Sequence, residues 1–243
     1  MPASYGLIGY PLAQSFSAAY FSKKFAAEHI DASFEAFPLA DIKEFPALLR
    51  ELPSLRGLSV TIPHKTSVIP FLDAVDSTAK EIGAVNSICI KNGFTKGYNT
   101  DIIGFEQSLR PLLRSHHTHA LVLGTGGASK AVCYVLKKLG ISYLKVSRSK
   151  RDDTITYDEL NPALIQSHTL IINTSPLGMY PVVDACPQLP YPSLGPQHLL
   201  YDLIYNPAET KFLLSGKQYG ATIKNGLEML ELQAEASWKI WNE

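Results

Sequence analysis

A lysine and an aspartate are the residues of this 243-residue chain whose types and spacing best suit acid–base chemistry. Lys65 ends the run Ser59-Val60-Thr61-Ile62-Pro63-His64-Lys65, which predicts a short buried strand that stops at the proline and presents the lysine at its end. Burying an ammonium is costly unless it is paired or used. Asp101, at the end of Gly97-Tyr98-Asn99-Thr100-Asp101, is the candidate partner. The pair suits proton transfer, and a purely structural ion pair is the alternative.

A glycine-rich turn follows this candidate pair along the chain. Gly124-Thr125-Gly126-Gly127 comes directly after Ala120-Leu121-Val122-Leu123, an apolar run typical of a parallel strand buried on both faces. Glycines at such a place let the backbone approach a pyrophosphate, and the next helix N-terminus favours its negative charge. The fingerprint is imperfect, because Ser129 stands where its third glycine would fall. The context still predicts a nucleotide site.

Basic residues at the end of the next predicted strand bear on which nucleotide binds. That strand ends in Ser147-Arg148-Ser149-Lys150-Arg151, and the first acidic residue after it is Asp152. An NAD site usually has an acidic residue here to hold the ribose 2′-hydroxyl. Three cations with two hydroxyls suit a 2′-phosphate instead, which favours NADP over NAD. A solvated basic turn without a ligand is the alternative.

The composition is that of an ordinary globular enzyme. Lys plus Arg and Asp plus Glu are both 22, so the net charge is zero and no polyanionic partner is implied. The three cysteines are scattered and odd in number, which suits reduced thiols. The N-terminus has no secretion signal, and no segment approaches the roughly 20 apolar residues of a membrane span. We therefore expect a cytoplasmic protein.

The predicted elements alternate between strand and helix in two regions. In the first region we expect strands at Leu7–Gly9, Ser33–Phe37 and before Thr61, a hairpin at Asn92-Gly93, and helices over Ala18–Glu28, Asp41–Leu52 and Ile102–Leu113. Ser17 is the expected N-cap of the first helix. In the second region we expect strands at Ala120–Leu123, Tyr143–Val146, Leu170–Asn173 and Leu199–Leu203, and a helix over Ser129–Leu139. This order predicts a doubly wound parallel sheet.

A last helix is predicted over Leu227–Trp241, where Leu227, Leu230, Ala234, Trp238 and Trp241 form an apolar stripe. We expect it to pack back onto the first region. Prolines make 180–197 a loop, and the histidines at positions 116, 117 and 119 lack the carboxylate or cysteine neighbours of a metal site. We expect a solvated loop there and no metal.

A series of short motifs runs through the whole chain in order. They are Ser15-Phe16-Ser17, Val60-Thr61-Ile62-Pro63-His64-Lys65, Gly83-Ala84-Val85-Asn86, Asn99-Thr100-Asp101, Gly124-Thr125-Gly126-Gly127-Ala128-Ser129, Asn173-Thr174-Ser175-Pro176-Leu177-Gly178-Met179, Asp202-Leu203-Ile204-Tyr205-Asn206-Pro207, Asn225-Gly226-Leu227 and Gln233-Ala234. In these motifs the chain resembles the shikimate dehydrogenase family over almost its full length. That family reduces 3-dehydroshikimate to shikimate with NADPH, on the way to aromatic amino acids.

The resemblance implies an α/β protein of two domains, with an active site in the cleft between them. A substrate-binding catalytic domain would comprise residues 1–101 and be completed by 225–243. Residues 102–224 would form a Rossmann-type NADP-binding domain. The implied ligands are NADP and shikimate or 3-dehydroshikimate, with no nucleic acid or membrane partner, in a monomer or homodimer.

The resemblance also assigns roles by position. Lys65 matches the catalytic lysine that relays a proton to the reacting oxygen, and Asp101 matches its acidic partner. The substrate contacts would be Ser15, Ser17 and Tyr205 near the carboxylate, and Thr61, Asn86 and Gln233 at the ring hydroxyls or the pocket wall. The cofactor contacts would be Gly124, Thr125, Gly126, Gly127, Ala128, Ser147, Arg148, Ser149, Lys150 and Arg151, with Leu203 and Gly226 beside the nicotinamide. The structural alternatives are that Ser17 only caps a helix and that Asn86 only forms a turn.

The chain departs from the family pattern at a few positions. Gln14 and Ala18 replace a histidine and a proline around the two serines, and Ser147 replaces the usual asparagine before Arg148. Two other functions remain open at this point. One is an NAD-dependent quinate/shikimate dehydrogenase, and the other is a catalytically inactive nucleotide-binding regulator of the same fold.

Overall fold

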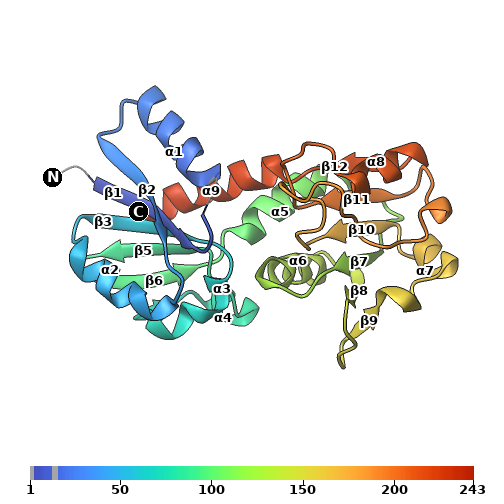
Figure 1. Cartoon of the computed structure of the whole chain (residues 1–243), viewed down its shortest axis with the longest axis horizontal. Helices are drawn as coiled ribbons and strands as arrows, with labels where there is room; N and C mark the ends of the chain where they lie inside the picture. The colour runs from blue at the N-terminus through green and yellow to red at the C-terminus, as the bar shows by residue number, and fades with distance from the viewer. Residues whose placement is uncertain (1–2, 13–15) are drawn as a thin grey trace. The chain divides into compact units, whose positions relative to one another are not determined.

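The protein forms two compact units in a computed structural model that describes residues 3–12 and 16–243. Unit 1 comprises Met1–Ile103 and Glu231–Glu243, and unit 2 comprises Gly104–Leu230. Unit 1 is therefore made of two separate stretches of the chain. The helices α5 (Asp101–Leu109) and α9 (Leu227–Trp241) each contain one of the unit boundaries (Figure 1).

Unit 1 contains a mixed six-stranded sheet in the order β2-β1-β3-β5-β6-β4. Its strands are β1 (Ala3–Gly9), β2 (Ala32–Pro38), β3 (Leu55–Val60), β4 (Ala74–Val75), β5 (Ser87–Lys91) and β6 (Phe94–Tyr98). Strands β5 and β6 pair antiparallel around Asn92 and Gly93, whose φ angles of 52° and 81° suit a two-residue hairpin turn. The hairpin predicted from these two residues is confirmed.

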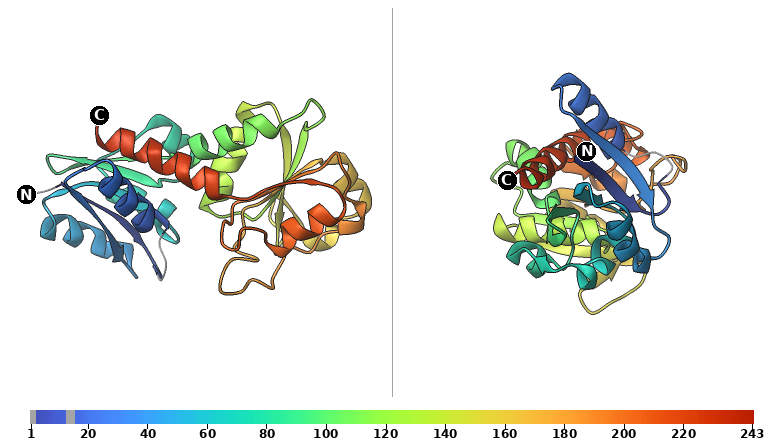
Figure 2. Two further views of the ribbon diagram at one scale, coloured as in Figure 1. Left: turned by 90° about the horizontal axis from the view of Figure 1, so that it is seen from above. Right: turned by 90° about the vertical axis from the view of Figure 1, so that its left-hand side faces the viewer.

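Helices and apolar clusters cover both faces of this sheet. The helices are α1 (Phe16–Ala27), α2 (Phe45–Glu51), α3 (His64–Ser67) and α4 (Ser77–Ile82). Leu7 of β1 packs with Phe21 of α1 and Trp241 of α9, whereas the next residue, Ile8, packs with Phe45 of α2. Successive side chains of a strand point to opposite faces, so α1 and α9 lie on one face and α2 on the other (Figure 2).

Unit 2 contains a six-stranded sheet in the order β12-β11-β10-β7-β8-β9, in which every pairing is parallel. Its strands are β7 (His119–Leu123), β8 (Ser142–Ser147), β9 (Thr154–Thr156), β10 (Leu170–Asn173), β11 (Leu199–Asp202) and β12 (Thr222–Lys224). Leu200 packs with Phe212 on one face, and Tyr201 packs edge-on against Phe105 of α5 on the other. The predicted doubly wound parallel sheet is confirmed.

The remaining helices of unit 2 follow the strands in the alternating order that the sequence predicts. They are α6 (Gly127–Lys138), α7 (Pro162–Ser167) and α8 (Lys211–Gln218) (Figure 1). The proline-rich stretch after β10 contains a single 3₁₀ turn at Tyr191–Ser193. Within the ranges 3–12 and 16–243, no helix is long and apolar enough to cross a bilayer.

Two predictions about local structure are wrong. Strand β3 ends at Val60, Ile62 is 65% exposed, and Lys65 lies in the short helix α3 rather than at the end of a strand. The chain turns after Val60 because His64 N donates to Thr61 O and the proline between them has no N–H for a ladder. Ser17 is not an N-cap, since α1 begins at Phe16, whose ring stacks on the ring of Tyr20 one turn later.

Candidate active site

Lys65 and Asp101 form an ion pair in unit 1. The ammonium Nζ of Lys65, on α3, lies 2.6 Å from Oδ2 of Asp101, the first residue of α5. The side chain of Asp101 is 7% exposed, whereas that of Lys65 keeps 17%. A charge-assisted hydrogen bond of this length holds the ammonium in place, and its remaining exposure leaves it reachable by a small molecule.

Asn86 fixes the other oxygen of the same carboxylate. Its Nδ2 lies 2.9 Å from Asp101 Oδ1, 3.0 Å from Thr100 Oγ1 and 3.2 Å from Gln233 Oε1, and its Oδ1 accepts from Thr100 N at 2.6 Å. The β5–β6 hairpin brings Asn86 next to Thr100 and Asp101, because β5 begins just after Asn86 and β6 ends shortly before Thr100. Asp101, Asn86 and Gln233, which the sequence analysis singled out, therefore share one buried polar network.

Two residues of this network were missed in the sequence analysis. The hydroxyls of Thr100 and Ser237 are 2.9 Å apart, both residues are fully buried, and Ser237 donates to Gln233 O. Ser237 lies one helical turn after Gln233 on α9. A polar residue on the buried side of a helix was the signal that could have identified it.

The other expected substrate contacts of unit 1 are Thr61, just after β3, and Ser17, in α1. Thr61 is half-buried. A Cβ at position 9 would lie 2.3 Å from Thr61 Cγ2, so only glycine fits at that position. Ser17 is half-buried in the first turn of α1. Ser15 lies outside the described residues.

The glycine turn of unit 2 fits a pyrophosphate. Gly124 has a φ of +118°, and a Cβ there would lie 2.8 Å from Thr174 Oγ1. Gly126 caps α6 and is exposed, and apart from its chain neighbours no described atom lies within 4 Å of a Cβ built on it. Thr125, Gly127 and Ala128 continue this turn into the helix. Open space above a helix N-terminus is what an anionic phosphate needs.

The basic segment after β8 contains two arginines, Arg148 and Arg151, that form no ion pair with an acidic residue of the described ranges. Arg148 is exposed and makes no ion pair with a residue of the described ranges, whereas Lys150 Nζ lies 2.6 Å from Glu159 Oε1. Ser147 is buried, and Ser149 and Arg151 are exposed. Burial raises the pKa of Tyr157, and the charge of Arg148 partly opposes that rise. Arg148 directly follows the end of β8, where the sequence analysis expects the 2′-phosphate, and Arg151 lies three residues further along.

The segments that follow β11 and β12 approach each other closely in unit 2. A Cβ on Gly226 would lie 2.1 Å from Leu203 O, and Gly226 N donates to Ile204 O at 3.0 Å. No side chain fits at position 226, so the backbone after β11 lies against the segment after β12. Tyr205, two residues after Leu203, is half-buried, and burial raises the pKa of its phenol.

The cofactor contacts expected in unit 2 lie at or just after the carboxyl ends of parallel strands. The turn after β7, the basic segment after β8 and the segments after β11 and β12 lie along one edge of the sheet. That edge is where open α/β sheets bind nucleotides.

Comparison with known proteins decides the family. Residues 7–88 match the model of the shikimate dehydrogenase substrate binding domain. The chain is 34% identical to the shikimate dehydrogenase (NADP(+)) of Methanosphaera stadtmanae, over 97% of this chain and 90% of the relative. It is 39% identical to that of Oleidesulfovibrio alaskensis, over 98% of this chain and 88% of the relative. The chain belongs to the shikimate dehydrogenase family.

Solved structures of shikimate dehydrogenases share the fold. That of Aquifex aeolicus is 33% identical, with a TM-score of 0.89 over 99% of this chain and 92% of that one. That of Thermus thermophilus, in complex with NADP(H) and shikimate, is 28% identical, with a TM-score of 0.87 over 98% of this chain and 93% of that one.

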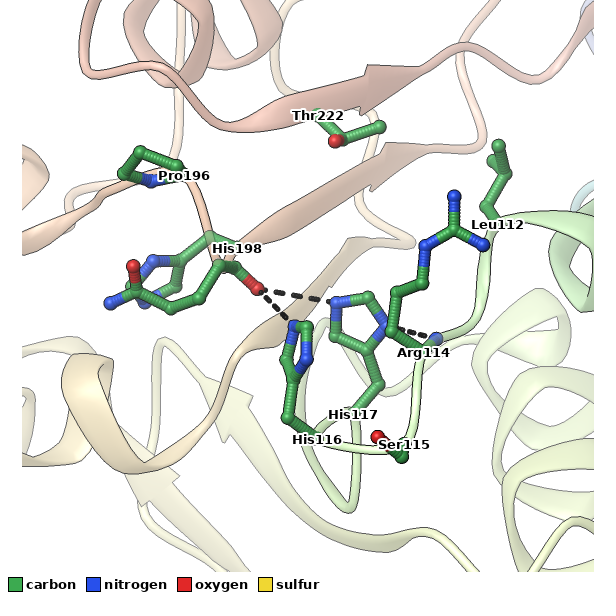
Figure 3. Close-up of a pocket in the computed structure, with 9 residues that line it drawn as sticks. Leu112, Arg114, Ser115, His116, His117, Pro196, His198 and Thr222 are labelled. Atoms are coloured by element: carbon green, nitrogen blue, oxygen red, sulfur yellow. Dashed lines mark hydrogen bonds between the residues drawn. The ribbon is translucent and has the colours of Figure 1, made fainter.

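In this member of the shikimate dehydrogenase family, a separate pocket of about 440 Å³ lies in unit 2, beside the strand β12 residue Thr222. Its walls include Arg114 and the histidines at 116, 117 and 198 (Figure 3). The rings of His116 and His117 both point at Gln197 O, at 3.0 and 3.2 Å, and Arg114 N donates to His117 Nδ1. The predicted solvated loop is wrong for His117, which is buried and hydrogen-bonded to backbone, and burial lowers its pKa.

Proposed function

We propose that this protein is an NADP-dependent shikimate dehydrogenase that interconverts 3-dehydroshikimate and shikimate in the route to aromatic amino acids. The observation that carries the proposal is the Lys65–Asp101 ion pair of 2.6 Å, braced by Asn86, in a chain that aligns with shikimate dehydrogenases (NADP(+)) over nearly its full length. Both members of the pair are present and in contact, which counts against a catalytically inactive regulator.

The proton side of the reaction belongs to unit 1. Reducing a ketone to a secondary alcohol needs a hydride on carbon and a proton on oxygen. Lys65 hydrogen-bonds the reacting oxygen and delivers its proton, and Asp101 holds the ammonium in position. By their match to the family positions, Gln233 and Thr61 offer an amide and a hydroxyl to the ring hydroxyls of the substrate. Asn86, whose amide already bonds to Asp101 and Thr100, lines the same pocket.

The substrate carboxylate needs donors rather than bulk charge. Ser15, Ser17 and Tyr205 supply three hydroxyls for it, by their match to the family positions. Hydroxyl donors can orient a carboxylate, while the amide groups of unit 1 bind the neighbouring ring hydroxyls.

The cofactor side belongs to unit 2. NADP, when bound, supplies or accepts the hydride. Gly124, Gly126 and the N-terminus of α6 receive its pyrophosphate, and Arg148 pairs with the 2′-phosphate. By their match to the family positions, Leu203 and Gly226 offer their backbone to the nicotinamide, and Gly226 has no side chain to hold the two segments apart. Unit 1 is thus the substrate-binding part and unit 2 the NADP-binding part.

The NAD-dependent quinate alternative is less well supported. Strand β8 ends at Ser147 and Arg148 follows it, where an NAD site usually has an acidic residue. The nearest acids, Asp152 and Asp153, come after the basic segment. A cytoplasmic location and a monomeric or homodimeric state stay predictions.

Product identification tests the proposed function. The purified protein is incubated with 3-dehydroshikimate and NADPH, and the product is identified by proton NMR. We expect shikimate in an amount equal to the NADPH consumed. Consumption of NADPH without shikimate, or no consumption at all, overturns the proposal.

A further inference from the structure

A buried carboxylate in unit 2 has no part in the proposed reaction. Asp202, the last residue of β11, is fully buried and pairs with no lysine or arginine of the described residues. Burial raises the pKa of Asp202 to about 6. A buried carboxyl group is costly unless its oxygens are hydrogen-bonded, and Asp202 accepts from three donors.

The two oxygens of Asp202 receive donors from three separate segments. Oδ2 accepts from Thr210 Oγ1 at 2.6 Å, and Thr210 is the N-cap of α8. Oδ1 accepts from Ile204 N at 3.1 Å and from Asn173 Nδ2 at 3.0 Å. One carboxylate therefore ties the end of β10, the segment after β11 and the start of α8 together.

The network continues into the loop after β10. Asn173 Oδ1 accepts from the Ser175 backbone N at 3.1 Å and from its hydroxyl at 2.7 Å, and Asn173 O accepts from Leu203 N at 3.0 Å. Leu203 is thus held from both sides, by Asn173 through its own N–H and by Asp202 through the N–H of Ile204. Its carbonyl then lies against Gly226.

We propose that Asp202 is a positioning residue for the nicotinamide end of the cofactor, acting through the backbone of Leu203 and Ile204. This inference rests on the proposed function, which places Leu203 beside the nicotinamide. Asp202 itself touches neither substrate nor cofactor. Its carboxylate sets the direction in which the chain leaves β11, and with it the place of Tyr205.

A purely structural role makes a different prediction from a positioning role. Loss of a purely structural carboxylate weakens binding of every ligand of unit 2 together or of none. Loss of a positioning carboxylate weakens only the part of the ligand that the segment after β11 faces. The cofactor fragment 2′-phospho-ADP-ribose has the pyrophosphate and the 2′-phosphate but no nicotinamide, so it separates the two cases.

The test compares Asp202→Asn with wild type by calorimetric titration of NADPH and of 2′-phospho-ADP-ribose. The asparagine side chain has the same size as that of aspartate. Its NH₂ group, in the place of Oδ2, cannot accept the hydrogen bond that the Thr210 hydroxyl donates. We expect about tenfold weaker NADPH binding, from the loss of a hydrogen bond to a charged acceptor. We expect unchanged binding of the fragment and a lower kcat. Equal loss for both ligands, or no loss for either, overturns the inference.

Thr210 supplies a second pair of variants in case Asp202→Asn does not fold. Thr210→Val removes the hydroxyl that donates to Asp202 Oδ2, whereas Thr210→Ser keeps it. We expect the selective loss of NADPH affinity in the valine variant and its rescue in the serine variant. Identical behaviour of the two variants overturns the inference.

Two further measurements separate this inference from the proposed function. Asp184→Asn makes the same chemical change at a carboxylate that is 86% exposed, and we expect it to bind both ligands as wild type does. If wild type oxidises no shikimate, the proposed function fails. If wild type is active and Asp202→Asn binds both ligands unchanged, the inference fails and the proposed function stands.

Discussion

At the scale of single residues, the proposed chemistry depends on where one ammonium is held. Lys65 is oriented by Asp101, Asp101 by Asn86, and Asn86 by Thr100 and Gln233. Each link is a hydrogen bond between groups that are mostly buried, where such bonds are strong and an unpaired group is costly. This chain of contacts holds the Lys65 ammonium in one place, as the proposed role of proton donor requires.

Replacing Lys65 tests this role. In Lys65→Ala we expect kcat for shikimate oxidation to fall by about 10²–10⁴-fold, the usual contribution of a positioned acid–base group. The dissociation constant for shikimate should change much less, because other side chains bind its hydroxyls and carboxylate. Steady-state kinetics and calorimetry measure the two quantities, with Lys80→Ala on the exposed side of α4 as the control. Turnover like that of wild type would contradict the mechanism.

Arg148 tests the choice of cofactor at the same scale. In Arg148→Ala we expect the KM for NADPH to rise by about tenfold or more, from the loss of a charge-assisted bond to the 2′-phosphate. The KM for NADH should stay within the error of the assay. Lys150→Ala should have a smaller effect, because that ammonium already pairs with Glu159. Equal rises for the two cofactors would remove the assignment of the 2′-phosphate to Arg148.

At the scale of elements, the C-terminal helix completes unit 1. Trp241 of α9 packs among the rings of Tyr5, Phe21 and Phe34, and its own ring lies against the backbone of Gly57 on β3. The same helix brings Gln233 and Ser237 to the hairpin residues around Asp101. The packing of α9 therefore supports both the core and the candidate site.

Gly57 gives a direct test of this packing. A Cβ at position 57 would lie 2.4 Å from the ring of Trp241, so the helix or the ring must shift in Gly57→Ala. We expect the free energy of unfolding, measured by urea denaturation, to fall by about 1–3 kcal/mol, as overpacking of a core does. Gly195→Ala is the control, because its Cβ meets only the flexible end of Gln197. Equal stability of the Gly57 variant and wild type would contradict this packing.

The elements also show which features can be predicted from sequence. The hairpin at Asn92 and Gly93 and the helix Leu227–Trp241 are predictable, because turn chemistry and a helical stripe are local signals. Strands β4, β9 and β12 have only two or three residues each and were not predicted. Strands so short exist only through their pairing with a neighbour, which periodicity does not reveal.

At the scale of the whole molecule, the chain is two α/β units, one with a mixed sheet and one with a parallel sheet. The parallel sheet was predictable from strand–helix alternation, and the glycine turn from its place after a buried strand. The partners of Asn86 were not predictable, because Thr100 and Ser237 meet it only through tertiary pairing. The position of Lys65 on a helical turn was also missed, since a four-residue helix leaves no periodic signal.

The most direct test of the account is a single spectrophotometric comparison of wild-type protein. Oxidation of shikimate and of quinate is followed with NADP and with NAD, and kcat/KM is obtained for each of the four combinations. The account predicts the highest kcat/KM for shikimate with NADP. A preference for NAD, a preference for quinate, or no turnover in any combination would contradict it.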